Sequence, residues 1–220
     1  MNPDDWQKLL TELGAKKNTD DLFQALLKSY SEPHRAYHTL SHVNDCLKEL
    51  GRSRHLADNE NEIKVAIWFH DAVCKPTASD NEEKSAQWAE KVLAEAMISH
   101  STVRRISDLI MATKHPCKPE SCDAKLLVDI DLSILGRHPD VFNDYETKIR
   151  IEYKRIPWFI YRKKRAELLK SFLNQDQIYM TKEFCDRYEE QAGKNLERSI
   201  AELLNLNIQN TNPQYSISAS

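Results

Sequence analysis

The chain has 220 residues and a formal net charge of −3. This small charge gives no electrostatic reason to expect general binding to nucleic acid or to a membrane surface, and the length suits one large domain. Only four glycines are present, between long amphipathic segments rich in Leu, Ala, Glu and Lys, which favours helices over tight hairpins. The sequence therefore predicts an all-α protein.

Five cysteines are scattered along the chain, and none of them belongs to a CxxC pair. The first residues, MNPDDWQKLL, are acidic where a secretory leader would be basic and then apolar. No apolar run approaches the roughly 20 residues that a transmembrane helix needs. We therefore expect a cytoplasmic protein with reduced cysteines and no membrane partner.

Apolar residues recur at helical spacing along most of the chain, and capping or breaking residues separate the periodic segments. Asp80 with Glu83 resembles a capping box and predicts the start of one helix. Gly14 and Gly51 each follow a periodic segment and predict where two other helices end. The expected helices cover residues 4–13, 19–30, 39–50, 58–73, 80–96, 102–113, 124–135, 138–155, 158–174 and 181–206.

We expect these helices to form one single-domain bundle over residues 1–206. The chain shows no internal repeat and no linker long enough to divide domains. The tail at residues 207–220, NIQNTNPQYSISAS, is polar and has no hydrophobic period, so we expect it to be flexible.

Four short segments carry side chains that could bind a metal ion or a phosphate. They are YHTLSH with His38 and His42, IWFHDAV with His70 and Asp71, TKHP with Lys114 and His115, and LLVDIDLSILG with Asp129 and Asp131. Taken singly, each has an ordinary explanation, because an inward-facing histidine is usually a hydrogen-bonded core residue. Burying a carboxylate among aliphatic residues, however, costs several kcal/mol unless a partner compensates. Two such segments in one chain favour a shared divalent cation.

The helical pattern supports this interpretation for His70. The periodic apolar positions of this segment are Ile63, Ala66, Ile67 and His70, and the spacing turns His70 toward the core. Two imidazoles and two carboxylates fill only part of an octahedral coordination sphere, and open positions are typical of a catalytic metal site. We expect a divalent cation as cofactor, one of Mn, Mg, Ni, Co, Fe or Zn.

The order His, His-Asp, Asp on successive helices resembles the HD-domain superfamily of metal-dependent phosphohydrolases, which is also similar to the cyclic-nucleotide phosphodiesterases. The similarity is greater to a subgroup of predicted HD phosphohydrolases of comparable length. Seven segments between residues 30 and 205 carry it in order: YHTLSHV, WFHDAV, DNEEKSA, ATKH, DIDLSILG, IRIEY and YRKKRAELLKSFLNQDQIYMT. The resemblance implies an HD-type helical bundle that hydrolyses a phosphoester.

The resemblance also implies roles for individual residues. The residues that correspond to its metal ligands are His42, His70, Asp71 and Asp131. Asp131 matches better than Asp129, because DLS aligns with the Asp-x-Leu element that closes such sites, but both aspartates stay open as the last ligand. His38, four residues before the first ligand, corresponds to the acid that protonates the leaving oxygen. Glu82 would orient the water or a histidine ligand, or else it is an ordinary acidic residue at a helix N-terminus.

A phosphorylated substrate would need basic side chains. Residues 148–165 contain eight Lys or Arg residues and one acid, and Arg150 in this run is the expected anion contact. Lys114 and His115 are further candidates for substrate binding, although a histidine at a helix end could simply satisfy carbonyl groups. The basic run has no stacking-aromatic motif, so the sequence does not favour nucleic-acid binding.

Three functions are compatible with the pattern. The leading hypothesis is a metal-dependent phosphohydrolase that acts on a small phosphorylated substrate such as a nucleotide. The first alternative is an HD-type di-iron oxygenase, which would need more histidine ligands than the pattern offers. The second is a non-catalytic regulatory module that binds a metal or a nucleotide, and the intact set of four ligands argues against it. The sequence leaves a homodimer open.

Overall fold

Every regular element in the described part of the chain is helical, which confirms the predicted all-α class. The structure is a computed structural model and describes residues 2–114 and 119–205. Its elements in chain order are α1 (Pro3–Glu12), α2 (Asp20–Ser29), α3 (Leu40–Ser53), the 3₁₀-helix η1 (Arg54–Leu56), α4 (Glu60–Phe69), α5 (Asn81–Glu95), α6 (His100–Ala112), α7 (Cys122–Leu132), the 3₁₀-helix η2 (Ser133–Gly136), α8 (Pro139–Glu152), α9 (Trp158–Leu173) and α10 (Lys182–Asn205). None of these helices combines the length and the apolar character needed to cross a membrane.

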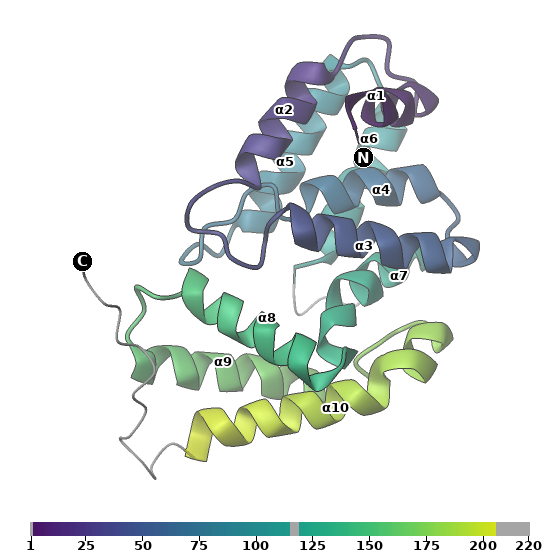
Figure 1. Cartoon of the computed structure of the whole chain (residues 1–220). Coiled ribbons are helices and arrows are strands. Elements are labelled where there is room, and N and C mark those ends of the chain that lie inside the picture. Colours follow the sequence, from purple (N-terminus) through teal and green to yellow (C-terminus); the bar gives the residue numbers. More distant parts are fainter. Residues whose placement is uncertain (1, 115–118, 206–220) are drawn as a thin grey trace.

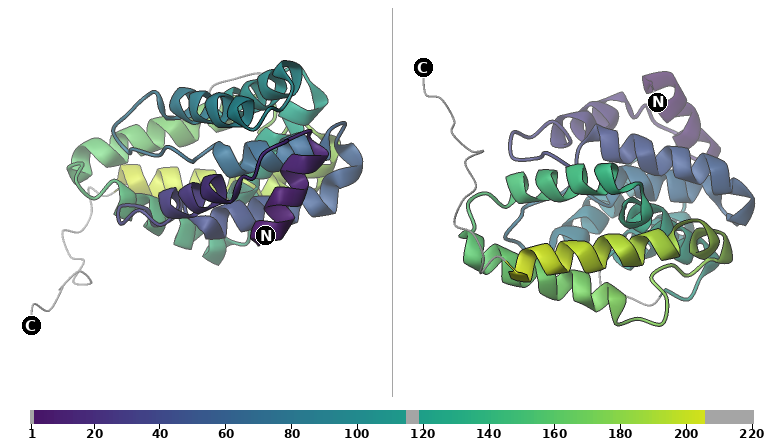
Figure 2. Two further views of the ribbon diagram at one scale, coloured as in Figure 1. Left: turned by 90° about the horizontal axis from the view of Figure 1, so that it is seen from above. Right: turned by 60° about the horizontal axis from the view of Figure 1, so that its bottom comes forward.

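The helices form two groups, with α7 between them (Figure 1). In the upper group of Figure 1, α5 packs on α6, α6 on α4, and α4 on α3; in the lower group, α9 packs along α10, as Figure 2 also shows. A single cluster of buried apolar side chains runs through both groups, from Trp6 in α1 to Leu203 in α10. The two groups therefore share one hydrophobic core.

Helix α4 lies inside the upper group, and its second half, from Val65 to Phe69, is apolar on all its faces. Its residues with 0–2% of their surface exposed are Ile63, Val65, Ala66, Ile67, Trp68 and Phe69. A helix of this kind needs neighbours all round, and α3 and α6 are two of them. This burial fixes the position at which the chain leaves α4, immediately before His70.

The end of α4 depends on side chains that bind its last carbonyl groups. His70 Nδ1 lies 2.8 Å from the Ile67 carbonyl oxygen, and the Tyr30 hydroxyl donates to the Trp68 carbonyl oxygen at 3.0 Å. Such partners replace the helical hydrogen bonds that these carbonyl groups would otherwise need. The chain can therefore turn directly after Phe69.

Two expected helix ends were wrong, and one helix begins where expected but without the expected cap. The helix predicted over residues 58–73 ends at Phe69, for the reason just given. Helix α3 continues through Gly51, since a glycine inside a helix costs only about 1 kcal/mol. Asp80 precedes α5 but makes no capping hydrogen bond, and its carboxylate pairs with Lys84 at 2.7 Å instead.

Two residues of the α7–η2 region hold α10 in place. The Asp129 carboxylate accepts backbone N–H bonds from Met180 (2.8 Å) and Thr181 (2.7 Å), directly before α10 begins. Gly136 lies so close to Tyr188 that a Cβ atom at this position would be 2.5 Å from the Tyr188 Cβ atom. The contact between η2 and α10 therefore requires a residue without a side chain.

Candidate metal centre

Three separate segments bring the four predicted ligands together. His42 lies in the first turns of α3, and His70 and Asp71 follow the end of α4. Asp131 lies in the last turn of α7. These segments are far apart in sequence, and the packing of α3, α4 and α7 on one another creates the cluster.

The donor atoms of this cluster are close enough to share one ion. His42 Nε2 and His70 Nε2 are 3.2 Å apart. Asp71 Oδ2 lies 2.9 Å from His70 Nε2 and 3.5 Å from His42 Nε2, and Asp131 Oδ1 lies 3.1 Å from His42 Nε2 and 3.5 Å from His70 Nε2. Ligand atoms about 2.0–2.2 Å from a cation are separated from their neighbours by about 3.0–3.5 Å. His42, His70 and Asp131 have donor atoms within 4.8 Å of one another, which suits a single divalent ion, and the Asp71 carboxylate lies close to both histidines.

Asp131 is the aspartate of LLVDIDLSILG that reaches the cluster. Asp129 is fully buried, and its carboxylate binds the backbone of Met180 and Thr181 as well as the Thr181 hydroxyl at 2.6 Å. Two residues that are two positions apart on a helix are rotated by about 200° about the helix axis, so their side chains project to roughly opposite sides. One of the two aspartates therefore faces the cluster while the other faces the start of α10.

The second ring nitrogen of His70 sets its tautomer. His70 Nδ1 lies 2.8 Å from the Ile67 carbonyl oxygen, and a carbonyl group can only accept, so Nδ1 carries the proton. In the neutral ring, the lone pair of Nε2 then points toward His42 and the carboxylates. An outer hydrogen bond of this kind usually accompanies a metal-binding histidine.

The carboxylates and histidines of the cluster shift each other's protonation. Burial opposes a charge on His70, but Asp71 and Asp131 raise its pKa well above the ordinary value. Burial also opposes the ionised form of Asp131, yet hydrogen bonds with His42 and His70 hold its pKa well below the usual range. The pKa of Asp71 is lowered against burial as well, chiefly by the charge of His70. A cation that enters the cluster therefore competes with a proton.

His38 lies just before α3, beside the cluster. Its Nδ1 is 2.6 Å from Glu152 Oε2, while Glu152 Oε1 accepts the backbone N–H groups of residues 36–38 at 2.7–3.0 Å. Burial acts to raise the pKa of Glu152, but His38 and these N–H groups lower it to about 2. Burial likewise opposes a charge on His38, but Asp71, Cys74 and Glu152 raise its pKa well above the ordinary value. These contacts therefore favour the protonated form of the His38 ring.

Glu152 was not identified in the sequence as a functional residue. It is the one acid among the eight basic residues of the segment 148–165, and this contrast is the signal that could have identified it. His38, Cys74 and Glu152 also form a second group with metal-binding atoms within 4.8 Å of one another. Because the Glu152 carboxylate already accepts three backbone N–H groups and pairs with His38, we interpret this group as a hydrogen-bonded support for His38.

Glu82 and Lys114, both predicted site residues, differ in how they relate to the cluster. Glu82 is half-buried in the first turn of α5, and burial, with a smaller contribution from the Asp71 carboxylate, raises its pKa. Lys114 forms a short ion pair with Glu83 and donates to the Ser79 carbonyl oxygen at 3.0 Å. The Glu82 carboxyl group therefore experiences the charge of the cluster, whereas the Lys114 ammonium group already has two partners.

Arg150 contacts the end of its own helix. Its Nη1 donates to the carbonyl oxygens of Tyr153 (2.7 Å) and Ile156 (3.1 Å), and its guanidinium group lies 4.7 Å from the centre of the Tyr161 ring. These contacts stabilise the C-terminus of α8 and do not bring Arg150 to the four ligands. His115, the remaining predicted substrate contact, lies outside the described residues.

Arg35 is a second residue that sequence analysis missed. Its side chain is fully buried, and it donates to the carbonyl oxygens of His38 (3.0 Å), Asp71 (2.8 Å) and Ala72 (3.0 Å). Three carbonyl groups bound by one guanidinium group join the segment before α3 to the turn after α4. The signal in the sequence is weak, an arginine three residues before His38.

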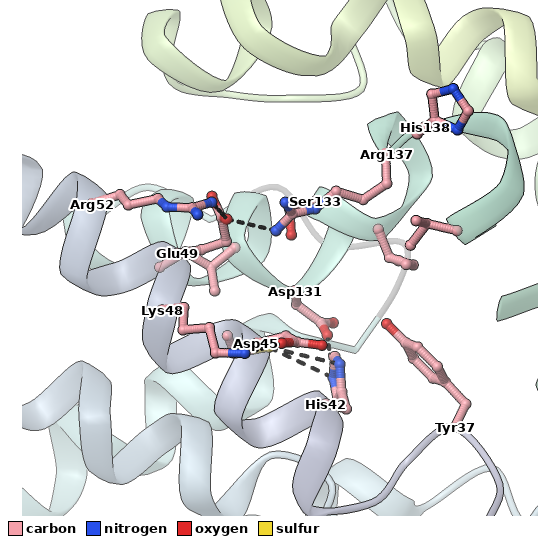
Figure 3. Close-up of a pocket in the computed structure, with 14 residues that line it drawn as sticks. Tyr37, His42, Asp45, Lys48, Glu49, Arg52, Asp131, Ser133, Arg137 and His138 are labelled. Carbon is pink, nitrogen blue, oxygen red and sulfur yellow. Dashed lines mark hydrogen bonds and ion pairs between the residues drawn. The ribbon is translucent and has the colours of Figure 1, made fainter. Parts of the chain in front are cut away.

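A pocket of about 420 Å³ opens beside the cluster. His42, Asp131 and Tyr37 line it (Figure 3). Figure 3 also shows Arg52 and Arg137 directed at Glu49, on a part of the wall away from His42. The volume lies in the range of small-molecule sites, about 300–1,000 Å³.

Comparisons with known proteins assign no function to this chain, so a function has to be argued from its own residues. Models of protein families, curated proteins and solved structures were each compared with the chain, and none of them matched. The resemblance of short segments to HD-domain proteins therefore stays a prediction. The finding that bears on function is the group His42, His70 and Asp131, whose donor atoms could hold a metal ion, with Asp71 close to both histidines and a pocket beside them.

Proposed function

We propose that this protein is a metal-dependent phosphohydrolase of HD type that cleaves a small phosphoester. The observation that carries the proposal is that the Nε2 atoms of two histidines lie 3.2 Å apart and 2.9–3.5 Å from the carboxylates of two aspartates, beside a pocket. Nitrogen and oxygen donors in this number suit a divalent cation and leave coordination positions for water or substrate. The residues that would hold the cation are His42, His70, Asp71 and Asp131.

A divalent cation at this position would make a water molecule nucleophilic near neutral pH and would polarise the phosphoryl group. His38 would act as the general acid. Glu152 binds His38 Nδ1 and so orients the ring, and the raised pKa favours the protonated ring. Because the leaving alkoxide needs a proton, a protonated and oriented imidazole supports this role.

Glu82 would position the attacking water. Its carboxyl group is half-buried, and burial raises its pKa above that of an exposed glutamate, toward neutral pH. A carboxyl group with such a pKa exchanges protons more readily at neutral pH. The role is that of a base or of an orienting hydrogen-bond acceptor.

The proposal is tested by metal analysis of the purified protein and by hydrolysis of nucleotides and sugar phosphates with Mn, Mg, Ni, Co or Zn added. We expect hydrolysis of at least one phosphoester by the wild type and loss of both bound metal and activity in Asp71→Asn. Asp45→Asn is the matched control, because Asp45 is a carboxylate of the same pocket that pairs with Lys48 at 2.9 Å.

A wild type that binds metal but hydrolyses none of these phosphoesters would refute the proposed activity. Tightly bound iron together with oxygen uptake would instead favour a di-iron oxygenase. Bound metal or nucleotide without either reaction would favour a regulatory module.

A further inference from the structure

A buried carboxylate surrounded by arginines forms part of the pocket wall. Glu49 in α3 is fully buried. Its Oε1 accepts hydrogen bonds from Arg52 (2.6 Å) and Arg137 (2.5 Å), and its Oε2 accepts from Arg187 (3.2 Å) and from the Tyr188 hydroxyl (2.9 Å). Burial acts to raise the pKa of Glu49, but Arg137 and Tyr188 lower it, so the carboxylate is ionised at neutral pH.

Arg187 also pairs with Glu183, so Glu49 has to balance both Arg52 and Arg137, which leaves an excess of one positive charge. Arg52 and Arg137 line the pocket, and Arg187 is not among the described residues that do so. The side chains of Arg52 and Arg137 are 59% and 28% exposed. Lys48, another base of the pocket, is already paired with Asp45. The excess charge therefore faces the pocket.

The arginine group is also held in a fixed orientation. Arg137 bonds to Glu49 and lies over the Tyr188 ring, 5.4 Å from its centre. A guanidinium group has five N–H donors in one plane, so the bond to Glu49 leaves donors for a ligand. A guanidinium group whose orientation is already fixed suits the oxygens of a phosphate or a carboxylate.

The same pocket contains apolar surface. Tyr37, Ile134 and Val141 line it in addition to the charged residues, and Val141 is 48% exposed. An apolar lining of this kind fits the carbon skeleton of a small molecule. The pocket thus combines two of the predicted metal ligands, an apolar surface and two arginines that share one carboxylate.

We propose that Arg52 and Arg137 bind a second anionic group of the substrate, whose scissile phosphoester lies at His42 and Asp131. This inference rests on the proposed function and names the substrate class. The substrate is a small phosphoester with a second phosphate or a carboxylate on the same carbon skeleton, that is, a bisphosphate or a phosphorylated carboxylic acid.

Two substrate pairs distinguish these sources of negative charge. Fructose 6-phosphate with fructose 1,6-bisphosphate tests a second phosphate, and glycerol 3-phosphate with 3-phosphoglycerate tests a carboxylate. We expect KM to be lower by about tenfold or more for the doubly anionic member of at least one pair. Arg137→Gln should abolish this difference, whereas Arg187→Gln, which removes another partner of Glu49, should keep it. A KM difference that is absent, or that survives in Arg137→Gln, would overturn the inference while leaving the hydrolase proposal intact.

Binding to the metal-free protein separates this inference from the activity. We expect calorimetry to show binding of fructose 1,6-bisphosphate or of 3-phosphoglycerate to the wild type and to Arg187→Gln, and binding of the same compound weaker by about tenfold or more to Arg137→Gln. Arg52→Gln, at a more exposed position, provides a second test if Arg137→Gln is destabilised. Equal affinities of the wild type and both pocket variants, or no binding at all, would refute the arginine site. Arginine-dependent binding without hydrolysis would refute only the proposed activity.

Discussion

The Arg35 guanidinium group donates a 2.8 Å hydrogen bond to the backbone carbonyl oxygen of Asp71. The same Nη1 atom donates to the carbonyl oxygen of His38 at 3.0 Å. Arg35 thus fixes the backbone that carries a predicted ligand relative to the backbone that carries the predicted acid. It acts on the candidate site by positioning these two residues.

Replacing Arg35 by lysine should weaken metal binding by about tenfold or more and lower the free energy of unfolding by about 1.5–3 kcal/mol. A lysine ammonium group cannot reproduce the planar fork that reaches His38, Asp71 and Ala72 together. Metal competition titration and denaturant unfolding measure the two effects. Arg104→Lys, in an exposed ion pair with Asp108, is the matched control. An Arg35→Lys variant with wild-type metal affinity would show that Arg35 does not position the ligands.

Metal affinity should increase with pH through the neutral range. A cation can bind His70 only after the ring has lost its extra proton, and Asp71 and Asp131 raise the pKa of this ring above its ordinary value despite burial. Competition with the proton therefore extends above the ordinary histidine pKa of about 6.5. Calorimetric titrations between pH 6 and pH 8 should show the affinity increasing by up to about tenfold per pH unit for each displaced proton. An affinity that does not change over this range would contradict the assignment of His70 as a ligand.

Glu152→Gln should lose stability in a defined pH window. The folded-state pKa of Glu152 is lowered to about 2 from 4.5, so its ionised form stabilises the folded state above pH 4.5 and this contribution disappears as the pH falls toward 2. At neutral pH we expect the variant to be less stable by about 1.5–3 kcal/mol, because it loses a charge-assisted hydrogen bond to His38. Denaturant unfolding across pH 2–7 measures the difference. The two proteins should converge at the acidic end, and a constant difference would contradict the lowered pKa.

Two glycine substitutions should change stability in opposite directions. Gly136→Ala places a Cβ atom within 2.6 Å of the Tyr188 carbonyl oxygen and should cost about 1–3 kcal/mol, because the backbone of α10 has to move. Gly51→Ala adds a methyl group inside α3 that meets no atom within 4 Å, and should stabilise the protein by about 0.5–1 kcal/mol. Thermal unfolding of both variants compares them directly, and a destabilised Gly51→Ala would contradict the open space at α3.

The periodic apolar positions made the helices predictable from the sequence, and they also turned His70 toward the core. The end of α4 was not predictable in this way. Tyr30 and Arg35 bind carbonyl oxygens at and after the end of this helix, and both lie more than thirty residues earlier in the chain. A local pattern contains no information about such distant partners.

The residues of the candidate site also divide into those that a local sequence pattern predicts and those whose contacts it cannot predict. The motif selected Asp131, and helical geometry explains why Asp129, two residues away, faces α10 instead. Arg150 was selected from the composition of a basic run, but composition cannot show which groups a long side chain reaches. In the structure it binds carbonyl groups at the end of α8.

Helix α7 makes different contacts on its two sides. Asp131 on one side contacts His42 and His70, and Asp129 on the other binds the backbone of Met180 and Thr181. Since both aspartates belong to one rigid turn, a rotation of α7 about its axis that moved Asp131 would also pull Asp129 from the residues before α10. The contact between α7 and the residues before α10 therefore constrains the orientation of the Asp131 carboxylate toward His42 and His70.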